Sequence, residues 1–208
     1  MEYSKEFKAA LSAFSSIEKD HLIFRLLKKD RLLSKKLYFE LIDPETTDDK
    51  RDAMEEIVQE KVQLASGYIR NYKYFLSVIR KISAEITEHV KITTDKFGEV
   101  SLNLLLVNKV LDYSEDLNSQ RFDAVYKLHL YLINKIFRAL ILIQKLDEDY
   151  WMEIDTLLTE TESKIHSIPY LEKLCINNGL DFNWLKADQI PDHMDLVVKD
   201  IRNQGFLK

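Results

Sequence analysis

The sequence predicts an all-α protein, built as a multi-helix bundle or as a degenerate α-superhelix. The chain of 208 residues contains only 4 glycines and 3 prolines, whereas an all-β fold needs many turns and uses those residues freely. Lysine, glutamate, leucine and isoleucine dominate the composition, which favours helix. At this length a domain can bury enough apolar surface to be stable without a disulfide or a structural metal.

The longest strongly apolar segment, 122–146, predicts a central helix of about seven turns. The segment is interrupted by Lys127, Lys135 and Arg138, so we expect no membrane span. His129 lies roughly opposite the polar positions, and we interpret it as a core histidine bonded to a carbonyl rather than a buried ligand or acid/base group. The hydrophilic positions fall within about 60° of one another on the helix: Asp123, Lys127, Asn134, Arg138 and Lys145.

Three helices are predicted before the first break in the chain. Ser4 is expected to cap the first, whose apolar residues recur at helical spacing up to Ile17. Asp20 is expected to begin the second, and Asp30 to cap the third, which ends in the sequence LYFELI. That last stretch could be a strand by composition, but neighbouring strand signals are missing and helix is favoured.

The first clear break falls at 43–47, where a proline disfavours helical geometry at the residue before it. This weak seam is the only candidate for a boundary, so we expect one domain over 1–208. Thr46 or Thr47 has the chemistry of a helix N-terminus and should start an acidic helix over about 48–65.

The next helix, from 68 to 90, has the most regular amphipathic pattern in the chain, with its apolar residues within about 120° of the circumference. The segment 90–104 is ambiguous, because its β-branched residues could form a hairpin around Gly98. The apolar run that follows lacks alternation, so a helix over 99–113 is favoured.

The C-terminal third contains several local helix signals. Ser119 is a candidate cap for the central helix. A helix over about 149–166 begins with acidic residues, which favour helix N-termini. Pro169 suits the first position of a short helix that Gly179 ends, and Pro191 is expected to open the last helix. The whole pattern predicts about eight to ten helices without a fixed repeat.

Charge and cysteine content narrow the possible functions. A net charge of −5 argues against wholesale wrapping of nucleic acid. The single cysteine, Cys175, cannot form an internal disulfide, and a reducing compartment fits it best. The first residues include acids and lack the apolar core of a signal peptide, so we expect a cytoplasmic protein.

No motif for an enzyme emerges. The glycines at 67, 98, 179 and 205 are too scattered for a phosphate-binding loop, and one cysteine cannot build a zinc site. The sharpest enzymatic hypothesis is a carboxylate–histidine metal site between helices. Glu18 and His21 have the required spacing, but no second Glu-x-x-His motif occurs, so we expect no metal and no cofactor.

Two patterns supply binding candidates. Asn134 and Arg138 mark the only polar route to the interior along the central helix. Exposed aromatics beside cations can stack bases or bind phosphates, although a solvated face paired with the acidic block 40–62 is the simpler interpretation. Such residues share the outer face of the helix over 68–90: Arg70, Lys73, Tyr74, Arg80 and Lys81.

These observations favour a non-enzymatic protein-interaction or scaffold module, with another protein as its partner. A nucleic-acid or phosphate-ligand binder acting through the basic faces is the alternative, and a metal-dependent bundle enzyme is the least favoured hypothesis. The sequence does not indicate an oligomeric state.

Overall fold

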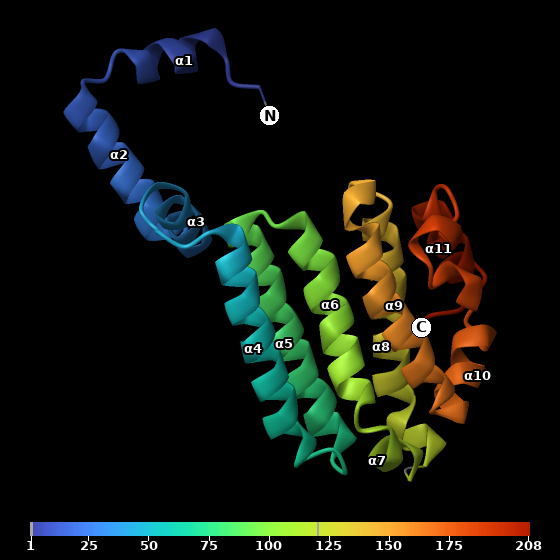
Figure 1. Cartoon of the computed structure of the whole chain (residues 1–208). Coiled ribbons are helices and arrows are strands. Elements are labelled where there is room, and N and C mark those ends of the chain that lie inside the picture. Colours follow the sequence, from blue (N-terminus) through green and yellow to red (C-terminus); the bar gives the residue numbers. More distant parts are fainter. Residues whose placement is uncertain (1, 120) are drawn as a thin grey trace. The chain divides into compact units, whose positions relative to one another are not determined.

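A computed structural model describes residues 2–119 and 121–208. In these ranges the protein is 79% helical, with eleven α-helices and no strands, which confirms the all-α prediction (Figure 1). The chain divides into two compact units, one of residues up to Pro44 with 91–93, the other of 45–90 and 94–208. One of the divisions between them follows Pro44, and the expectation of a single domain over 1–208 stays a prediction.

The first unit consists of three short helices, drawn in blue in Figure 1. Ser4 and Asp30 cap the first and third through their side chains, as predicted. The second begins before Asp20, because Ser15 and Glu18 form a reciprocal capping box. No residue of these helices is buried. Their bounds are α1 (Lys5–Ser12), α2 (Ser16–Lys29) and α3 (Arg31–Leu41).

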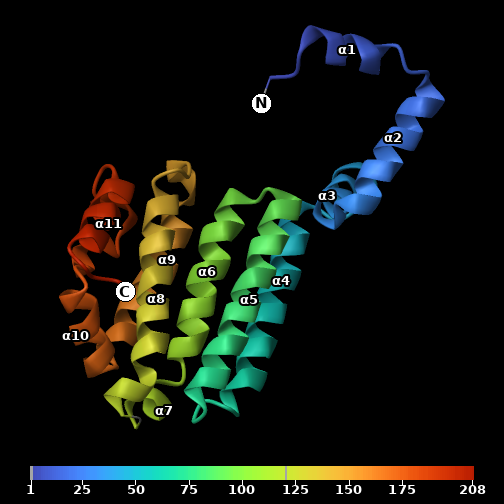
Figure 2. The same cartoon turned by 180° about the vertical axis from the view of Figure 1, so that it is seen from behind.

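The second unit contains the remaining helices except the last turn of α5, and Figures 1 and 2 show α4, α5, α6, α8 and α9 running side by side. Thr46 caps α4 with Asp49 in a second capping box, as expected from its position after the break. The bounds are α4 (Thr47–Ser66), α5 (Tyr72–Thr93), α6 (Lys96–Leu111), α7 (Ser114–Asn118), α8 (Phe122–Ile143), α9 (Trp151–His166), α10 (Pro169–Asn177) and α11 (Met194–Asn203).

The core is built around α8 and α6. The predicted central helix, α8, buries half of its 22 residues, while Asp123, Lys127 and Arg138 reach the surface and Asn134 is half-buried. The helix α6 shares the centre, because it packs against α4, α8 and α9 and buries 12 of its 16 residues. Apolar side chains surround α6 on nearly every side, which is why its sequence shows no single apolar face.

The alternative of a hairpin over 90–104 is wrong, because α5 continues to Thr93 and α6 begins at Lys96. Thr94 takes a left-handed conformation with φ of 56°, which ends α5. The Asp95 carboxylate accepts a hydrogen bond from the backbone N–H of Gly98 at 2.8 Å and so caps α6. A Cβ at Gly98 would lie only 2.2 Å from that carboxylate, so a larger residue at this position would displace the capping side chain.

Other helix boundaries agree with the prediction where the signal is local. Pro169 occupies the first turn of α10, and Gly179 follows that helix with φ of 81°. By contrast, α8 is preceded by Arg121 without a side-chain cap, so Ser119 does not cap it. The last helix begins three residues after Pro191, following His193 with φ of 57°. Across the described residues, no helix is long and apolar enough to cross a lipid bilayer.

Candidate functional site

The basic and aromatic residues predicted as a binding surface lie on and just before α5. All five side chains are exposed. Tyr74 packs edge-on against Tyr68, with ring centroids 5.1 Å apart. The surface comprises Arg70, which precedes α5, and Lys73, Tyr74, Arg80 and Lys81, which lie on it.

Arg80, although exposed, also contacts the central helix, α8. Its guanidinium carbon lies 5.5 Å from the ring centroid of Tyr131 on α8. Burial raises the pKa of the Tyr131 phenol, and a hydrogen bond with the Ser83 side chain opposes that rise. Arg80 therefore packs on an aromatic ring between α5 and α8 and is less available to an external phosphate.

Two residues of the predicted polar line, Asn134 and Arg138, are engaged by other groups of the protein. Arg138 donates to the Glu99 carboxylate on α6 at 3.2 Å. The Asn134 amide donates to the carbonyl of Leu130 at 2.9 Å and accepts from Arg202 on α11 at 3.3 Å. The two predicted candidates on α8 thus face different neighbouring helices and join the bundle together.

Lys135 is the one charged residue of α8 that lies outside the predicted polar line. Its ammonium group donates to Asn103 Oδ1 on α6 at 2.8 Å and to the Ser83 hydroxyl on α5. Burial, and then the positive charge of Arg138, lower the pKa of this lysine. The sequence shows Lys135 only as an interruption of the apolar run, whereas in the fold it links three helices.

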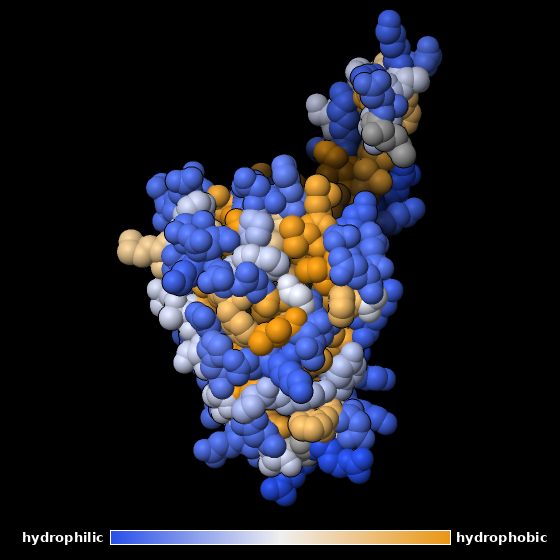
Figure 3. All heavy atoms as spheres, turned by 90° about the vertical axis from the view of Figure 1, so that its right-hand side faces the viewer, coloured by the Kyte–Doolittle hydropathy of each residue, from blue (hydrophilic) through white to orange (hydrophobic). Residues whose placement is uncertain are grey.

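A pocket of about 570 Å³ opens where α7, the first turns of α8 and the start of α10 meet. Figure 3 shows apolar atoms reaching the surface between hydrophilic ones on the side of the molecule that carries α10 and α11. The Asn118 amide on α7 donates to the carbonyl of Ser167 at 3.0 Å, which holds α7 against the start of α10. The apolar lining is Leu117, Phe122, Val125, Ile168, Tyr170 and Leu174.

His129 lies in the wall of this pocket. Its exposed fraction is 1%, and neither ring nitrogen has a hydrogen-bond partner in the protein. The prediction that His129 is a core residue is therefore confirmed, because the ring is buried. The prediction that it is bonded to a carbonyl is wrong, because no carbonyl accepts a hydrogen bond from the ring. Burial lowers the pKa of His129 to about 4, so the imidazole is neutral at pH 7.

Aromatic rings and one cation form the rim of the pocket. Phe122, 65% exposed, stacks on Tyr170 with ring centroids 4.4 Å apart. The Tyr170 ring also lies 5.6 Å from the His129 ring. Lys173, one turn further along α10, is exposed and lines the pocket.

Acidic and imidazole groups are dispersed through the described part of the chain, where no group of three His, Cys, Asp or Glu side chains is placed to hold a metal ion. Glu18 and His21, the pair with metal-site spacing, are both exposed on α2. His166 on α9 contacts the Glu172 carboxylate at 2.9 Å. The acidic and imidazole side chains therefore form isolated pairs, and a metal site normally needs three or more ligands.

No protein-family model, curated protein or solved structure matches this chain. The chemistry of its own residues is therefore the guide to its function.

Proposed function

We propose that the protein is a non-enzymatic protein-interaction module whose first 44 residues dock onto another protein. The observation that carries this proposal is that α1, α2 and α3 bury no residue while exposing many apolar side chains. Eleven of the twenty-one large apolar side chains that are exposed in the described chain lie between Tyr3 and Ile42. Apolar surface concentrated in this way marks interaction sites.

The apolar side chains of α2 favour a protein groove over a flat surface. With residues set 100° apart, they span more than half of the helix circumference. A bilayer surface contacts one side of a helix, whereas a groove between partner helices can enclose a wider face. The most exposed are Ile17 at 68%, Phe24 at 62% and Leu26 at 51%.

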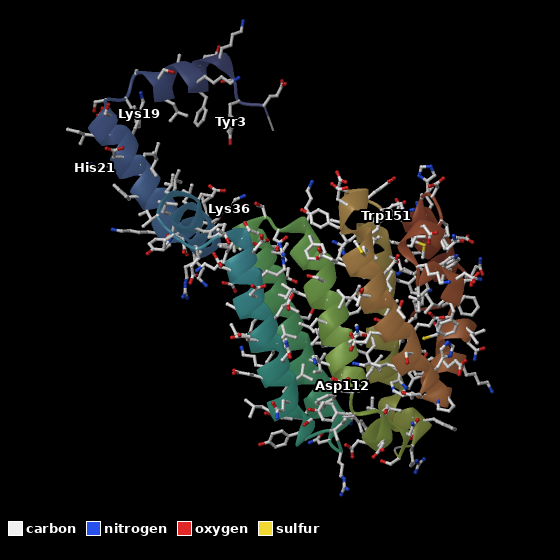
Figure 4. All side chains as sticks on the ribbon, viewed as in Figure 1. Tyr3, Lys19, His21, Lys36, Asp112 and Trp151 are labelled. Atoms are coloured by element: carbon white, nitrogen blue, oxygen red, sulfur yellow. The ribbon has the colours of Figure 1, made fainter. Side chains whose placement is uncertain are left out.

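Charge defines the chemistry of the partner. Residues 16–36 carry seven Lys/Arg and three Asp/Glu, and Figure 4 labels Lys19 on α2 and Lys36 on α3 among them. Cations beside an apolar face suit a partner whose apolar groove has an acidic rim, because complementary charge orients and speeds docking. The single buried thiol, Cys175, supports a reducing compartment such as the cytoplasm for this interaction.

The nucleic-acid alternative is supported less well. Arg80, one of the cations predicted to meet phosphates, packs on Tyr131, and Arg138, the cation on the predicted polar route to the interior, pairs with Glu99. The chain also carries a net charge of −5, which opposes binding to a phosphate backbone at long range.

Site-specific photo-crosslinking in cells that naturally produce the protein tests this proposal. Benzoylphenylalanine at Phe24 or Tyr38 is expected to yield one shared, acidic protein partner after irradiation. The same probe at Leu64 on α4 or Met152 on α9, exposed by 74% and 80%, provides the matched control. When the crosslinking is repeated in an extract of the same cells, raised salt should reduce crosslinking from Phe24, because part of the attraction is between exposed charges.

Two outcomes would contradict the proposal. One is an identical set of products from all four positions, which would indicate non-specific capture by exposed apolar groups. The other is crosslinking from Phe24 only to lipid or nucleic acid, which would replace the protein partner with another class of ligand.

A further inference from the structure

The pocket between α7, α8 and α10 has the size and lining of a small-molecule site. Its volume of about 570 Å³ falls within the range typical of ligand pockets, about 300–1,000 Å³. Leu117, Val125 and Leu174 give it an apolar floor, and the stacked rings of Phe122 and Tyr170 form one edge. Flat apolar surface beside stacked rings suits a planar ligand.

His129 adds a polar requirement inside this apolar floor. A neutral imidazole carries one donor and one acceptor nitrogen, and both are buried without a partner in the protein. Leaving such a group unpaired costs about 1–3 kcal/mol. Because His129 lines the pocket, a rotation of its ring that brings one nitrogen to the pocket surface would let a ligand with a hydroxyl or carbonyl in its apolar body recover that loss. The histidine therefore selects for a hydrogen-bonding group at depth.

The rim adds a preference for negative charge. Lys173 supplies a cation, and the first turn of α10, including Pro169 and Tyr170, lines the same opening. That helix has no side-chain cap at its N-terminus. Pro169 has no backbone N–H, and that of Glu172 donates to the Ile168 carbonyl, so the N–H groups of the first turn without a partner in the helix are those of Tyr170 and Leu171. The positive end of the helix dipole favours an anion beside them, and the Glu172 carboxylate of the same turn, which contacts His166, offsets part of this preference.

We propose that this pocket binds a small planar molecule that carries a hydroxyl or carbonyl group toward His129 and one acidic group toward Lys173. No residue that lines this pocket belongs to α1, α2 or α3, which are proposed to bind a protein. The protein would then bind a small molecule in this pocket in addition to its proposed protein partner.

Three naphthalene probes separate the two polar requirements. The compound 6-hydroxy-2-naphthoate has both groups, 2-naphthoate lacks the hydroxyl, and 2-naphthol lacks the carboxylate. Calorimetric titration into the full chain is expected to rank 6-hydroxy-2-naphthoate as the tightest of the three. In parallel, ¹⁵N-edited NMR of the histidine rings in the unsubstituted protein should show the His129 signals moving with the same saturation curve.

Substitutions then assign each group. The variant Lys173→Gln is expected to weaken the binding of the two carboxylate-bearing probes about threefold to tenfold and to leave the affinity for 2-naphthol unchanged. The variant His129→Leu should weaken both hydroxyl-bearing probes about fivefold to tenfold and spare 2-naphthoate. Lys186→Gln, at an exposed lysine outside the pocket, is the matched control and should change nothing. Val125→Phe should reduce binding of all three probes by filling the floor.

The proposal is overturned if no probe moves the His129 signals at concentrations up to about 1 mM, a weak but measurable affinity. It is also overturned if binding persists unchanged in both His129→Leu and Val125→Phe, since the probes would then occupy exposed apolar faces elsewhere. The NMR arm uses the unsubstituted protein, so a variant that fails to fold does not remove the test.

Discussion

The ammonium group of Lys135 on α8 donates a hydrogen bond to Asn103 on α6 at 2.8 Å, joining the two helices that fill the core. Lys135→Ala would leave the Asn103 oxygen unpaired in a largely buried position, at a cost of about 2 kcal/mol in the free energy of unfolding. Urea unfolding measures this cost. Lys127→Ala, at an exposed lysine of the same helix, should change stability by less than about 0.5 kcal/mol. Equal effects would mean that Lys135 does not join the helices.

The position of α8 can be tested with a buried charge. Leu140 is fully buried on this helix, and Leu140→Asp should unfold the protein, because an unpaired buried carboxylate costs several kcal/mol, comparable to the total stability. Leu64→Asp, at a leucine 74% exposed on α4, should remain folded. Circular dichroism during heating distinguishes the two. A Leu140→Asp protein that melts like the parent would show that α8 is not central.

Acid should destabilise the folded protein through His129. Burial lowers the pKa of this imidazole from 6.5 to about 4, so between these values the unfolded chain binds more protons than the folded one. Above about pH 6.5 the group has no effect, and stability falls as the pH decreases from 6.5 to about 4. The total loss is about 3 kcal/mol, because one pKa unit corresponds to about 1.4 kcal/mol. The facing ring of Tyr170 stays neutral in this range.

Comparison with His129→Leu isolates that contribution. Between pH 7 and pH 5 the unsubstituted protein should lose about 2 kcal/mol more stability than the variant, as measured by urea unfolding at each pH. At pH 7 the variant should also be the more stable protein, because it removes a buried polar group without a partner. Parallel pH profiles for the two proteins would contradict the burial of a neutral His129.

The thiol of Cys175 should be unreactive in the folded protein. It is fully buried on α10, and burial, followed by the negative charge of Glu172, raises its pKa to about 12. Because the thiolate is the reactive form, modification by Ellman's reagent at pH 8 should follow unfolding and should become rapid in denaturant. Rapid modification without denaturant would indicate that α10 opens locally.

Local signals allowed much of the fold to be predicted. Ser4, Asp30 and Thr46 cap helices as expected, since capping depends on residues within one turn. Ser119 and Pro191 carry similar signals but do not start helices. A local preference can be outweighed by the tertiary packing of the helix that follows.

The pocket could not be predicted in the same way. Its lining comes from α7, α8 and α10, and the Phe122–Tyr170 stack joins residues far apart in the chain. The missing hydrogen-bond partners of His129 are equally a property of the folded core. For Arg80 and Arg138 the sequence showed the positive charge, whereas their partners, Tyr131 and Glu99, lie on other helices.

Hydrogen–deuterium exchange of the isolated full chain tests most directly whether the first 44 residues form an uncovered docking surface. Because α1, α2 and α3 bury no residue, their amides should exchange at least about a hundredfold faster than those of α6 and α8, and should become protected when the crosslinked partner is added. Protection of the three helices equal to that of α6, in the isolated protein at every concentration, would contradict the account, since their apolar faces would then already be covered within the chain.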